Sequence, residues 1–293
     1  MMFGAIEAGG TEFVCAVGTG PTDALVSEPI PTTTPAETLQ RVLAFFRAQG
    51  PLQAVGIGTF GPVDLNPASP TWGYITTTPK PGWANIPFAP TIRDALGLPV
   101  HFDTDVNVAA LGEHRWGAAQ EVQNFIYLTI GTGIGGGVMV GGRLLHGLIH
   151  PEIGHMLLPR DPAWDPYEGG CPYHRSCLEG LANGPALQAR WGVPGKDLPP
   201  DHEAWTLEAH YLGLALANLT VCFSPERLVL GGGVMRQTQL FPLVRKKVQY
   251  LLNGYVQHAL LQEGITQFVV PPALGDHAGV LGALALAQQG HVA

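Results

Sequence analysis

The feature that most constrains the fold is a pair of glycine-rich hairpins, one at the start of the chain and one near its middle. Each combines an apolar strand, a turn of glycine and threonine, and a second strand, which is typical of two antiparallel strands joined tightly. The first covers Phe3–Glu7, Ala8–Thr11 and Glu12–Gly18, and the second covers Phe125–Ile130, Gly131–Gly135 and Gly136–Val140. A unit repeated in both halves of 293 residues predicts two similar domains, each large enough for its own core.

Both turns have the composition of a phosphate-binding loop. Glycines let several backbone N–H groups point the same way, and threonine hydroxyls add donors, so phosphate oxygens are held without a basic cluster. The candidate residues are Gly9, Gly10 and Thr11 in the first turn and Gly131, Thr132 and Gly133 in the second. Two ordinary hairpins are the alternative. Neither turn is a Walker motif or a dinucleotide fingerprint, because no Gly-Lys-Ser/Thr follows and the glycines lead into a strand.

A third glycine cluster, Gly231, Gly232 and Gly233, follows the apolar run Leu228–Leu230. Ligands of α/β proteins bind at the carboxyl ends of strands, so this cluster is a candidate contact for a nucleotide base or ribose. A tight strand-to-helix turn explains it equally well.

Four candidate metal ligands lie close together in the sequence. Cys171, His174 and Cys177 are spaced three apart, and His155 precedes them. Two thiolates and two imidazoles favour four-coordinate Zn²⁺, and a shell closed by protein ligands indicates a structural ion. A chance cluster and a Cys171–Cys177 disulfide are the alternatives.

An acidic segment follows the predicted strand Leu98–Phe102. Asp105 stands where a helix of small residues is expected to begin, and as an N-cap it would stabilise that helix by about 1 kcal/mol. A carboxylate at the end of a strand can instead accept a substrate hydroxyl proton, as phosphoryl transfer requires. Asp103 is the other candidate base. Asn107 is a candidate ligand for a sugar hydroxyl or a continuation of the cap.

Two glutamates are further candidates for recognising hydroxyl groups. Glu152 lies three residues before His155, and a metal bound by that histidine would fix the loop carrying it, although a lone loop glutamate is usually solvated. Glu179 follows Cys177 by two residues. Its simpler role is a charge near a helix N-terminus.

The proline-rich loop 76–87 offers an apolar ring and an amide. Trp83 and Asn85 together suit the recognition of a sugar. Packing of the Trp83 ring on the protein is the alternative.

Charge and hydropathy exclude several classes of protein. The net charge is -8, and Arg245–Lys247 is the longest basic run, so binding to nucleic acid is disfavoured. No apolar run reaches the roughly 18 residues that span a bilayer. The first residues lack the basic start and apolar core of a signal peptide, so a cytoplasmic protein without membrane partners is expected.

In this order, the elements resemble the ROK family of sugar kinases and regulators over nearly the whole chain, and most closely its bacterial fructokinase branch. Glu7–Thr11 is similar to the first phosphate motif of the family, and Ile130–Gly137 to the second. Asp105-Val106-Asn107 is similar to its catalytic Asp-x-Asn. Glu152–His155 is similar to Glu-x-Gly-His, in which Glu contacts the sugar and His binds zinc. The run Cys171–Cys177 is similar to a short form of its zinc loop.

The resemblance implies an α/β fold of two actin-like (ribonuclease H-like) domains flanking a cleft. Residues 1–108 are expected to form the N-terminal domain and residues 109–277 the C-terminal domain with its zinc-binding loop. A C-terminal helix within residues 278–293 is expected to return to the first domain. The resemblance also implies ATP with Mg²⁺ as the phosphoryl donor, a structural Zn²⁺ and a homodimer.

The resulting hypothesis is phosphorylation of fructose at its 6-hydroxyl, with Asp105 as the base. Glu7 replaces an Asp common in the family, and Glu12 replaces a Lys. A carboxylate near the phosphates would repel them by roughly 1 kcal/mol or more at ~4 Å, but strand alternation puts Glu12 on the opposite face from Thr11. The alternatives are a kinase for mannose, glucose or an N-acylated amino sugar, and a catalytically silent sugar-binding protein. A DNA-binding repressor is disfavoured because only six residues precede Glu7.

Overall fold

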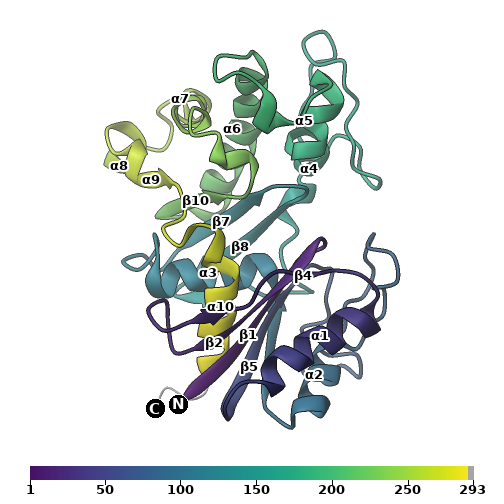
Figure 1. Ribbon diagram of the computed structural model, residues 1–293. Helices are drawn as coiled ribbons and strands as arrows, with labels where there is room; N and C mark the ends of the chain where they lie inside the picture. Colours follow the sequence, from purple (N-terminus) through teal and green to yellow (C-terminus); the bar gives the residue numbers. More distant parts are fainter. Residues whose placement is uncertain (290–293) are drawn as a thin grey trace. The chain divides into compact units, whose positions relative to one another are not determined.

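The computed structural model describes residues 1–289, which fall into two compact units (Figure 1). The first unit holds Met1–Glu121, Leu144–His150 and the chain from Ala273, and the second holds Val122–Arg143 and Pro151–Pro272. The expected boundary at residues 108/109 falls inside one continuous helix of the first unit, α3 (Asp105–Trp116), so the chain leaves this unit only after Glu121. The end of the expected segment 278–293, residues 290–293, lies outside the described residues.

A mixed sheet forms the centre of the first unit. Its strand order is β3 (Leu25–Val26), β2 (Glu12–Gly18), β1 (Met2–Ala8), β5 (Leu52–Thr59) and β6 (Val100–Thr104), with β4 (Ile30–Pro31) paired to β2. The N-terminal hairpin is confirmed, because β1 and β2 are antiparallel, and β5 and β6 continue the sheet in parallel with β1. The helices are α1 (Pro35–Arg47), α2 (Phe88–Leu96), α3 and α10 (Ala278–Gln288).

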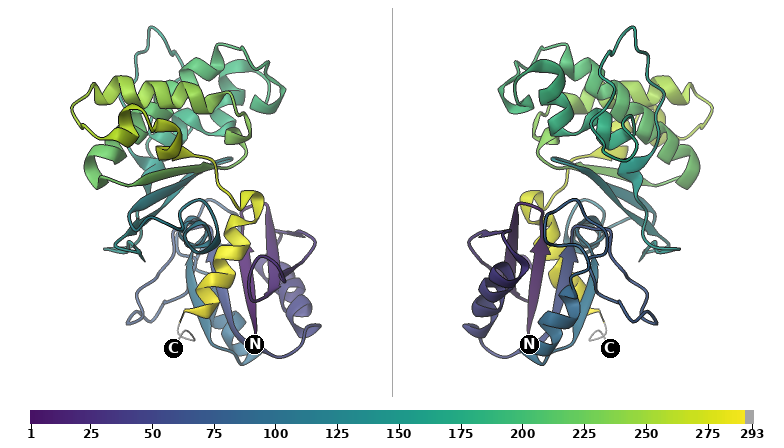
Figure 2. Two further views of the ribbon diagram at one scale, coloured as in Figure 1. Left: turned by 90° about the vertical axis from the view of Figure 1, so that its left-hand side faces the viewer. Right: turned by 90° about the vertical axis from the view of Figure 1, so that its right-hand side faces the viewer.

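Alternating side chains of the hairpin enter two cores on opposite faces of this sheet. Phe13 and Cys15 belong to one core, together with apolar residues of α1 and α2. Ala16 belongs to the other, which is covered by α10, the yellow helix along the sheet in Figure 2. Gly56 makes this packing possible, because a Cβ there would overlap the carbonyl oxygen of Ala283.

The second unit is built around another sheet. Its order is β11 (Val269–Val270), β10 (Arg227–Gly231), β7 (Phe125–Ile130), β8 (Ile134–Val140) and β9 (Arg143–Leu144). The second predicted hairpin is confirmed, since β7 and β8 are antiparallel, but β8 already begins at Ile134 because that residue pairs with Ile130. The helices are α4 (Leu178–Ala182), α5 (Gly184–Trp191), α6 (Ala204–Phe223), α7 (Leu240–Leu252), α8 (Ala259–Gln262) and α9 (Ile265–Phe268).

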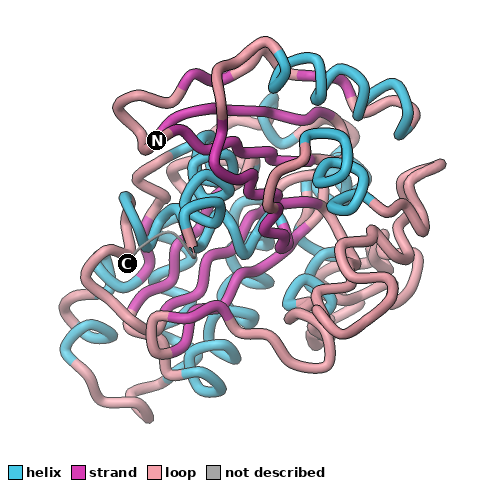
Figure 3. The backbone as a smooth tube through the Cα atoms, turned by 90° about the horizontal axis from the view of Figure 1, so that it is seen from below, coloured by secondary structure: helices cyan, strands magenta, loops and turns pink. Residues whose placement is uncertain are grey.

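Helices and long loops make up the rest of the second unit. Figure 3 shows the helices of both units in cyan and their loops in pink. The longest helix among the described residues, α6, is apolar over much of its surface and packs against α4 and α7. Within residues 1–289 no helix has both the length and the apolar character needed to cross a membrane.

Candidate active site and metal centre

The first glycine turn, between β1 and β2, is closed by its own backbone. The N–H of Gly9 donates to the carbonyl of Glu12 at 2.9 Å. Thr32 braces the turn twice, through its N–H to the carbonyl of Thr11 at 2.9 Å and through its hydroxyl to the carbonyl of Gly9 at 2.8 Å. A Cβ built on the exposed Gly10 would meet nothing within 4 Å. The turn is therefore a fixed backbone with open space in front of it.

Glu7 of β1 lies partly buried against the start of α10. Its carboxylate accepts the N–H of Val280, yet burial, and then the negative charge of Asp105, raise its pKa to about 7. Glu12 shares this sheet face, because Glu7 pairs with Val14 and alternate residues of β2 point the same way. The charge of Glu12 also raises the pKa of Glu7. The turn is thus flanked by carboxylates on one side.

Asp105 is the first residue of α3 and not its cap. Thr104 is the N-cap, since its hydroxyl oxygen accepts the N–H of Asn107 at 3.2 Å, so the capping alternative for Asp105 is wrong. The Oδ1 of Asp105 accepts the N–H of Val106 at 2.9 Å. Burial raises the pKa of Asp105 to about 6. Such a carboxylate is ionised at neutral pH and basic enough to take up a proton.

Asp103, the other candidate base, is already occupied. Its Oδ1 accepts the N–H of Thr104 at 2.8 Å and the side-chain amide of Asn107 at 2.6 Å, and its Oδ2 lies 2.8 Å from His146 Nε2. Asp103 is only 4% exposed. Both carboxylate oxygens of Asp103 are therefore engaged by neighbouring residues. Nothing in the sequence marks His146, a histidine 43 positions after Asp103, as a partner of that carboxylate.

Of the two candidate sugar-binding residues in the proline-rich loop, Trp83 and Asn85, only Asn85 has an exposed side chain. Trp83 is fully buried, with its ring centroid 5.3 Å from that of Phe13 and 6.3 Å from that of Phe88. Its Nε1 donates to the carbonyl of Thr33 at 2.9 Å. The ring completes the core and has no open face, which corrects the expectation that it recognises a sugar. Asn85 is exposed and lies in the left-handed region, with φ of 58°.

The second glycine turn, between β7 and β8, is held by residues of other elements. The N–H of Gly184 donates to the carbonyl of Gly131 at 2.8 Å. The side-chain amide of Asn183 donates to the carbonyl of Thr132 at 2.9 Å, while its oxygen caps α5. The start of α5 and the turn are therefore one hydrogen-bonded structure.

Glu179 braces the same turn from the first turn of α4. Its Oε2 accepts the N–H of Ile134 at 2.9 Å. A Cβ at Gly133 would lie 2.7 Å from this oxygen, so glycine leaves the room that the carboxylate needs. Glu179 thus places a negative charge near the N-terminus of α4, as predicted, and also contacts the candidate phosphate turn directly.

A cavity of about 430 Å³ lies beside the second turn. Its lining includes Gly131 and Thr132, and Gly233 from the third glycine cluster. Gly232 does not line it but has φ of +89° and packs against the backbone of Ile130, where a side chain would overlap. The volume is in the range of pockets that hold small organic ligands. Two of the predicted glycine clusters therefore meet at one cavity.

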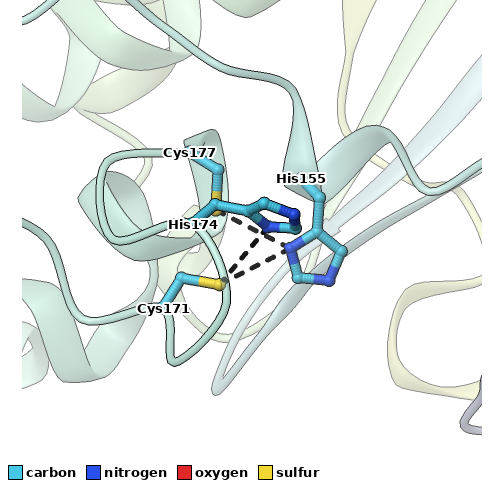
Figure 4. A group of neighbouring side chains, drawn as sticks. All are labelled: His155, Cys171, His174 and Cys177. Carbon is cyan, nitrogen blue, oxygen red and sulfur yellow. Dashed lines mark hydrogen bonds between the residues drawn. The ribbon is translucent and has the colours of Figure 1, made fainter. Parts of the chain in front are cut away.

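Four ligand atoms converge elsewhere in the second unit, on His155, Cys171, His174 and Cys177, and all lie within 4.8 Å of one another (Figure 4). The Sγ of Cys171 lies 3.7 Å from His155 Nδ1 and 3.8 Å from His174 Nδ1, and the Sγ of Cys177 lies 3.7 Å from His155 Nδ1. In a tetrahedral Zn²⁺ site the sulfur and nitrogen ligands stand about 3.5 Å apart, so the cluster fits the ion. Both cysteines are free thiols, so the disulfide alternative is wrong.

The metal cluster and the exposed Glu152 share one short segment. His155 ends a 3-10 helix, η1 (Ile153–His155), and its N–H donates to the carbonyl of Glu152 at 3.0 Å. Cys177 is the N-cap residue of α4, two positions before Glu179. A metal at the cluster would therefore tie together the segments that carry the two predicted sugar-binding glutamates.

Comparison with protein families identifies the chain, because residues 3–290 match the ROK family. The chain belongs to the ROK family. A fructokinase from Pediococcus pentosaceus is 48% identical over 290 residues, which cover 98% of each protein. The ROK hexokinase from Thermus thermophilus has a TM-score of 0.80 at 30% identity, over 99% of both chains. A ROK family glucokinase from Streptomyces griseus, in complex with glucose and AMPPNP, has a TM-score of 0.78 at 26% identity, over 99% of this chain and 100% of that one.

The two units are therefore the two actin-like, ribonuclease H-like domains of a ROK protein. The turn Gly9–Thr11, Asp105 and Asn107 belong to the first domain, whereas the cavity and the metal cluster belong to the second.

Sequence reasoning missed a buried carboxylate in the first domain. Glu113 accepts N–H groups of Ala118, Ala273 and Leu274 and so ties α3 to the chain that enters α10. Its only signal was an acidic residue at the end of an apolar helix.

Proposed function

We propose that this ROK protein is a fructokinase, which transfers the γ-phosphoryl group of ATP to the 6-hydroxyl of fructose. The identities support fructose, because they are 48% to a fructokinase but 30% to a hexokinase and 26% and 30% to two glucokinases. The observation that carries the proposal is Asp105, a partly buried carboxylate whose raised pKa of about 6 suits a general base.

In the proposed reaction, Asp105 takes the proton of the sugar hydroxyl. The hydroxyl oxygen bonds to the γ-phosphorus, the bond from phosphorus to the β–γ bridging oxygen breaks, and ADP leaves. Asp105 acts only in its ionised form, which dominates above a pH of about 6. Asp103 takes no part as a base, since both of its oxygens are hydrogen-bonded.

The glycine clusters are the proposed nucleotide contacts. Backbone N–H groups and hydroxyls of Gly9–Thr11 and Gly131–Gly133 hold phosphate oxygens, and the cavity beside the second turn holds the nucleoside, with Gly231–Gly233 next to it. Mg²⁺ bound to the nucleotide phosphates would offset the charge of the transferring group.

Sugar hydroxyls are assigned to side chains of both domains. Asn85 and Asn107 serve in the first, and Glu152 and Glu179 in the second. Trp83 is excluded because its ring is buried in the core. Glu179 accepts one backbone N–H on Oε2, which leaves its other oxygen for a hydroxyl.

The proposed Zn²⁺ is structural. His155, Cys171, His174 and Cys177 would hold the ion in a four-coordinate shell of protein ligands, and such a shell would leave no position for a substrate. The ion would supply rigidity to the loop that carries Glu152.

A ROK kinase for mannose, glucose or an N-acylated amino sugar is the second candidate, because hexoses that differ in one hydroxyl are separated by only a few kcal/mol. A catalytically silent sugar-binding protein would account for the carboxylates around the first turn but not for the raised pKa of Asp105. The homodimer implied by the family stays a prediction, which sedimentation velocity tests.

The experiment is ADP release by the zinc-loaded protein with MgATP and, separately, fructose, mannose, glucose and N-acetylmannosamine. The highest kcat/KM is expected with fructose. Preference for another sugar would keep the mechanism and reject the substrate. Absence of turnover with every sugar in a folded sample would contradict the proposed kinase activity.

A further inference from the structure

The side-chain amide of Asn107 is held in one orientation. Its Nδ2 donates to Asp103 Oδ1 at 2.6 Å. An ionised carboxylate accepts hydrogen bonds but cannot donate them, so the amide must turn its nitrogen toward Asp103 and its oxygen away. The opposite orientation would bring two acceptors together.

The amide oxygen that results is an unused acceptor. Asn107 is 1% exposed, and its Oδ1 is buried without a hydrogen-bond partner among residues 1–289. Leaving a buried acceptor unpaired is unfavourable, so such atoms in proteins usually meet water or a ligand. A ligand group that satisfies this oxygen must be a donor, and a hydroxyl is one.

His146 holds the carboxylate of Asp103, which in turn orients the side-chain amide of Asn107. Its Nε2 lies 2.8 Å from Asp103 Oδ2 and 3.5 Å from Asn107 Nδ2. Because the carboxylate accepts, this nitrogen carries the proton. The side chain of His146 is 42% exposed whereas that of Asp103 is 5% exposed, so the histidine covers the buried pair from the outside. It comes from Leu144–His150, the segment that returns to the first domain.

We propose that His146 is a positioning residue for substrate binding. With Asp103 it locks the amide of Asn107, so that Oδ1 accepts a hydrogen bond from a substrate hydroxyl. This inference rests on the proposed sugar kinase function, and it adds a residue and the direction of one hydrogen bond.

The first test compares His146→Leu with His146→Gln by steady-state kinetics and by calorimetric binding of fructose. Leucine removes the donor, and we expect about a tenfold rise in both KM and Kd for fructose, with kcat and KM for MgATP within about twofold of the original. Glutamine keeps a side-chain N–H and is expected to restore both constants to within about threefold. His258→Leu, which alters an exposed histidine before α8, is the control and should change neither. An unchanged KM for fructose in His146→Leu would overturn the proposal.

A double-mutant cycle separates positioning from a direct effect. In an Asn107→Ala background, His146→Leu is expected to change KM for fructose by less than about twofold, because the group that it positions is gone. Full additivity of the two substitutions would contradict a role through Asn107.

A readout without substrate separates this inference from the proposed function. Asp103→Asn keeps the shape of the side chain but lets the Asn107 amide rotate, so the ¹⁵N–¹H resonances of that amide should shift or broaden in this variant and in His146→Leu. Unchanged resonances in both would overturn the positioning role, whatever the activity. Failure of the original protein to phosphorylate any sugar would instead reject the proposed function.

Discussion

The two glycine hairpins share a strand–turn–strand pattern but are held in different ways. The first turn, at Gly9–Thr11, is closed by its own backbone and by Thr32, and carboxylates lie on one side of it. The second, at Gly131–Gly133, is braced by the start of α5 and by Glu179.

The electrostatic surroundings of the two turns differ as well. The first domain holds two carboxyls with raised pKa values, about 7 for Glu7 and about 6 for Asp105. The second turn has a cavity of about 430 Å³ beside it, and the carboxylate of Glu179 there accepts a backbone N–H. Under the proposed function, this contrast predicts a division of labour, with proton transfer at Asp105 in the first domain and the nucleoside cavity and the structural metal in the second.

Asp105→Asn should have the largest effect, because it removes the proposed base with little change in shape. We expect kcat to fall at least about a hundredfold. Asp94→Asn, an exposed carboxylate of α2 in the same domain, is the matched control and should keep full turnover. Near-normal turnover of Asp105→Asn would show that Asp105 is not the residue that accepts the proton.

The pH dependence of kcat/KM for fructose should follow Asp105. A base works only when ionised, so kcat/KM should fall as the pH drops below about 6, by about tenfold per unit, and stay level above it. Metal content measured at each pH separates this effect from loss of the ion. A profile that stays level down to pH 5 with the metal retained would argue against Asp105.

Cys177→Ser tests the second domain. Removing one thiolate should release the proposed Zn²⁺, loosen the segment that carries Glu152, and raise KM for fructose by about tenfold with a smaller effect on kcat. Cys222→Ser, at an exposed free thiol of α6, is the control. Mass spectrometry of metal content gives the answer, and one ion per chain in Cys177→Ser would show that the ligand set is wrong.

The smallest expected effects compare the two turns directly. Gly133→Ala places a Cβ 2.7 Å from Glu179 Oε2 and should cost about 1 kcal/mol of unfolding free energy, because the carboxylate must leave Ile134. Gly10→Ala meets nothing within 4 Å and should leave the free energy of unfolding unchanged. Its methyl group occupies the space proposed for phosphate, so KM for MgATP should still rise several-fold. Urea unfolding and kinetics measure both, and equal destabilisation by the two variants would contradict the difference in bracing.

Local patterns in the sequence predicted much of this arrangement. Both hairpins were expected where they occur, because glycine turns between apolar runs are a local signal. The convergence of Cys171, His174 and Cys177 was also expected, because a turn can direct side chains spaced three residues apart toward one point.

What the sequence did not predict depends on contacts between distant segments. The burial of Trp83 depends on Phe13 and Phe88, and a ring in a proline-rich loop looks the same whether it is buried or exposed. Thr104 took the cap because the strand β6 ends one residue before Asp105. His146 joins Asp103 only because the chain returns to the first domain at Leu144–His150.

The most direct test of the division of labour is equilibrium binding by Asp105→Asn. Calorimetric titration with fructose, and separately with AMPPNP and Mg²⁺, should give dissociation constants within about twofold of the original protein, although turnover has fallen at least about a hundredfold. A loss of binding that matches the loss of turnover would contradict the account, because Asp105 would then hold the substrates and not move the proton.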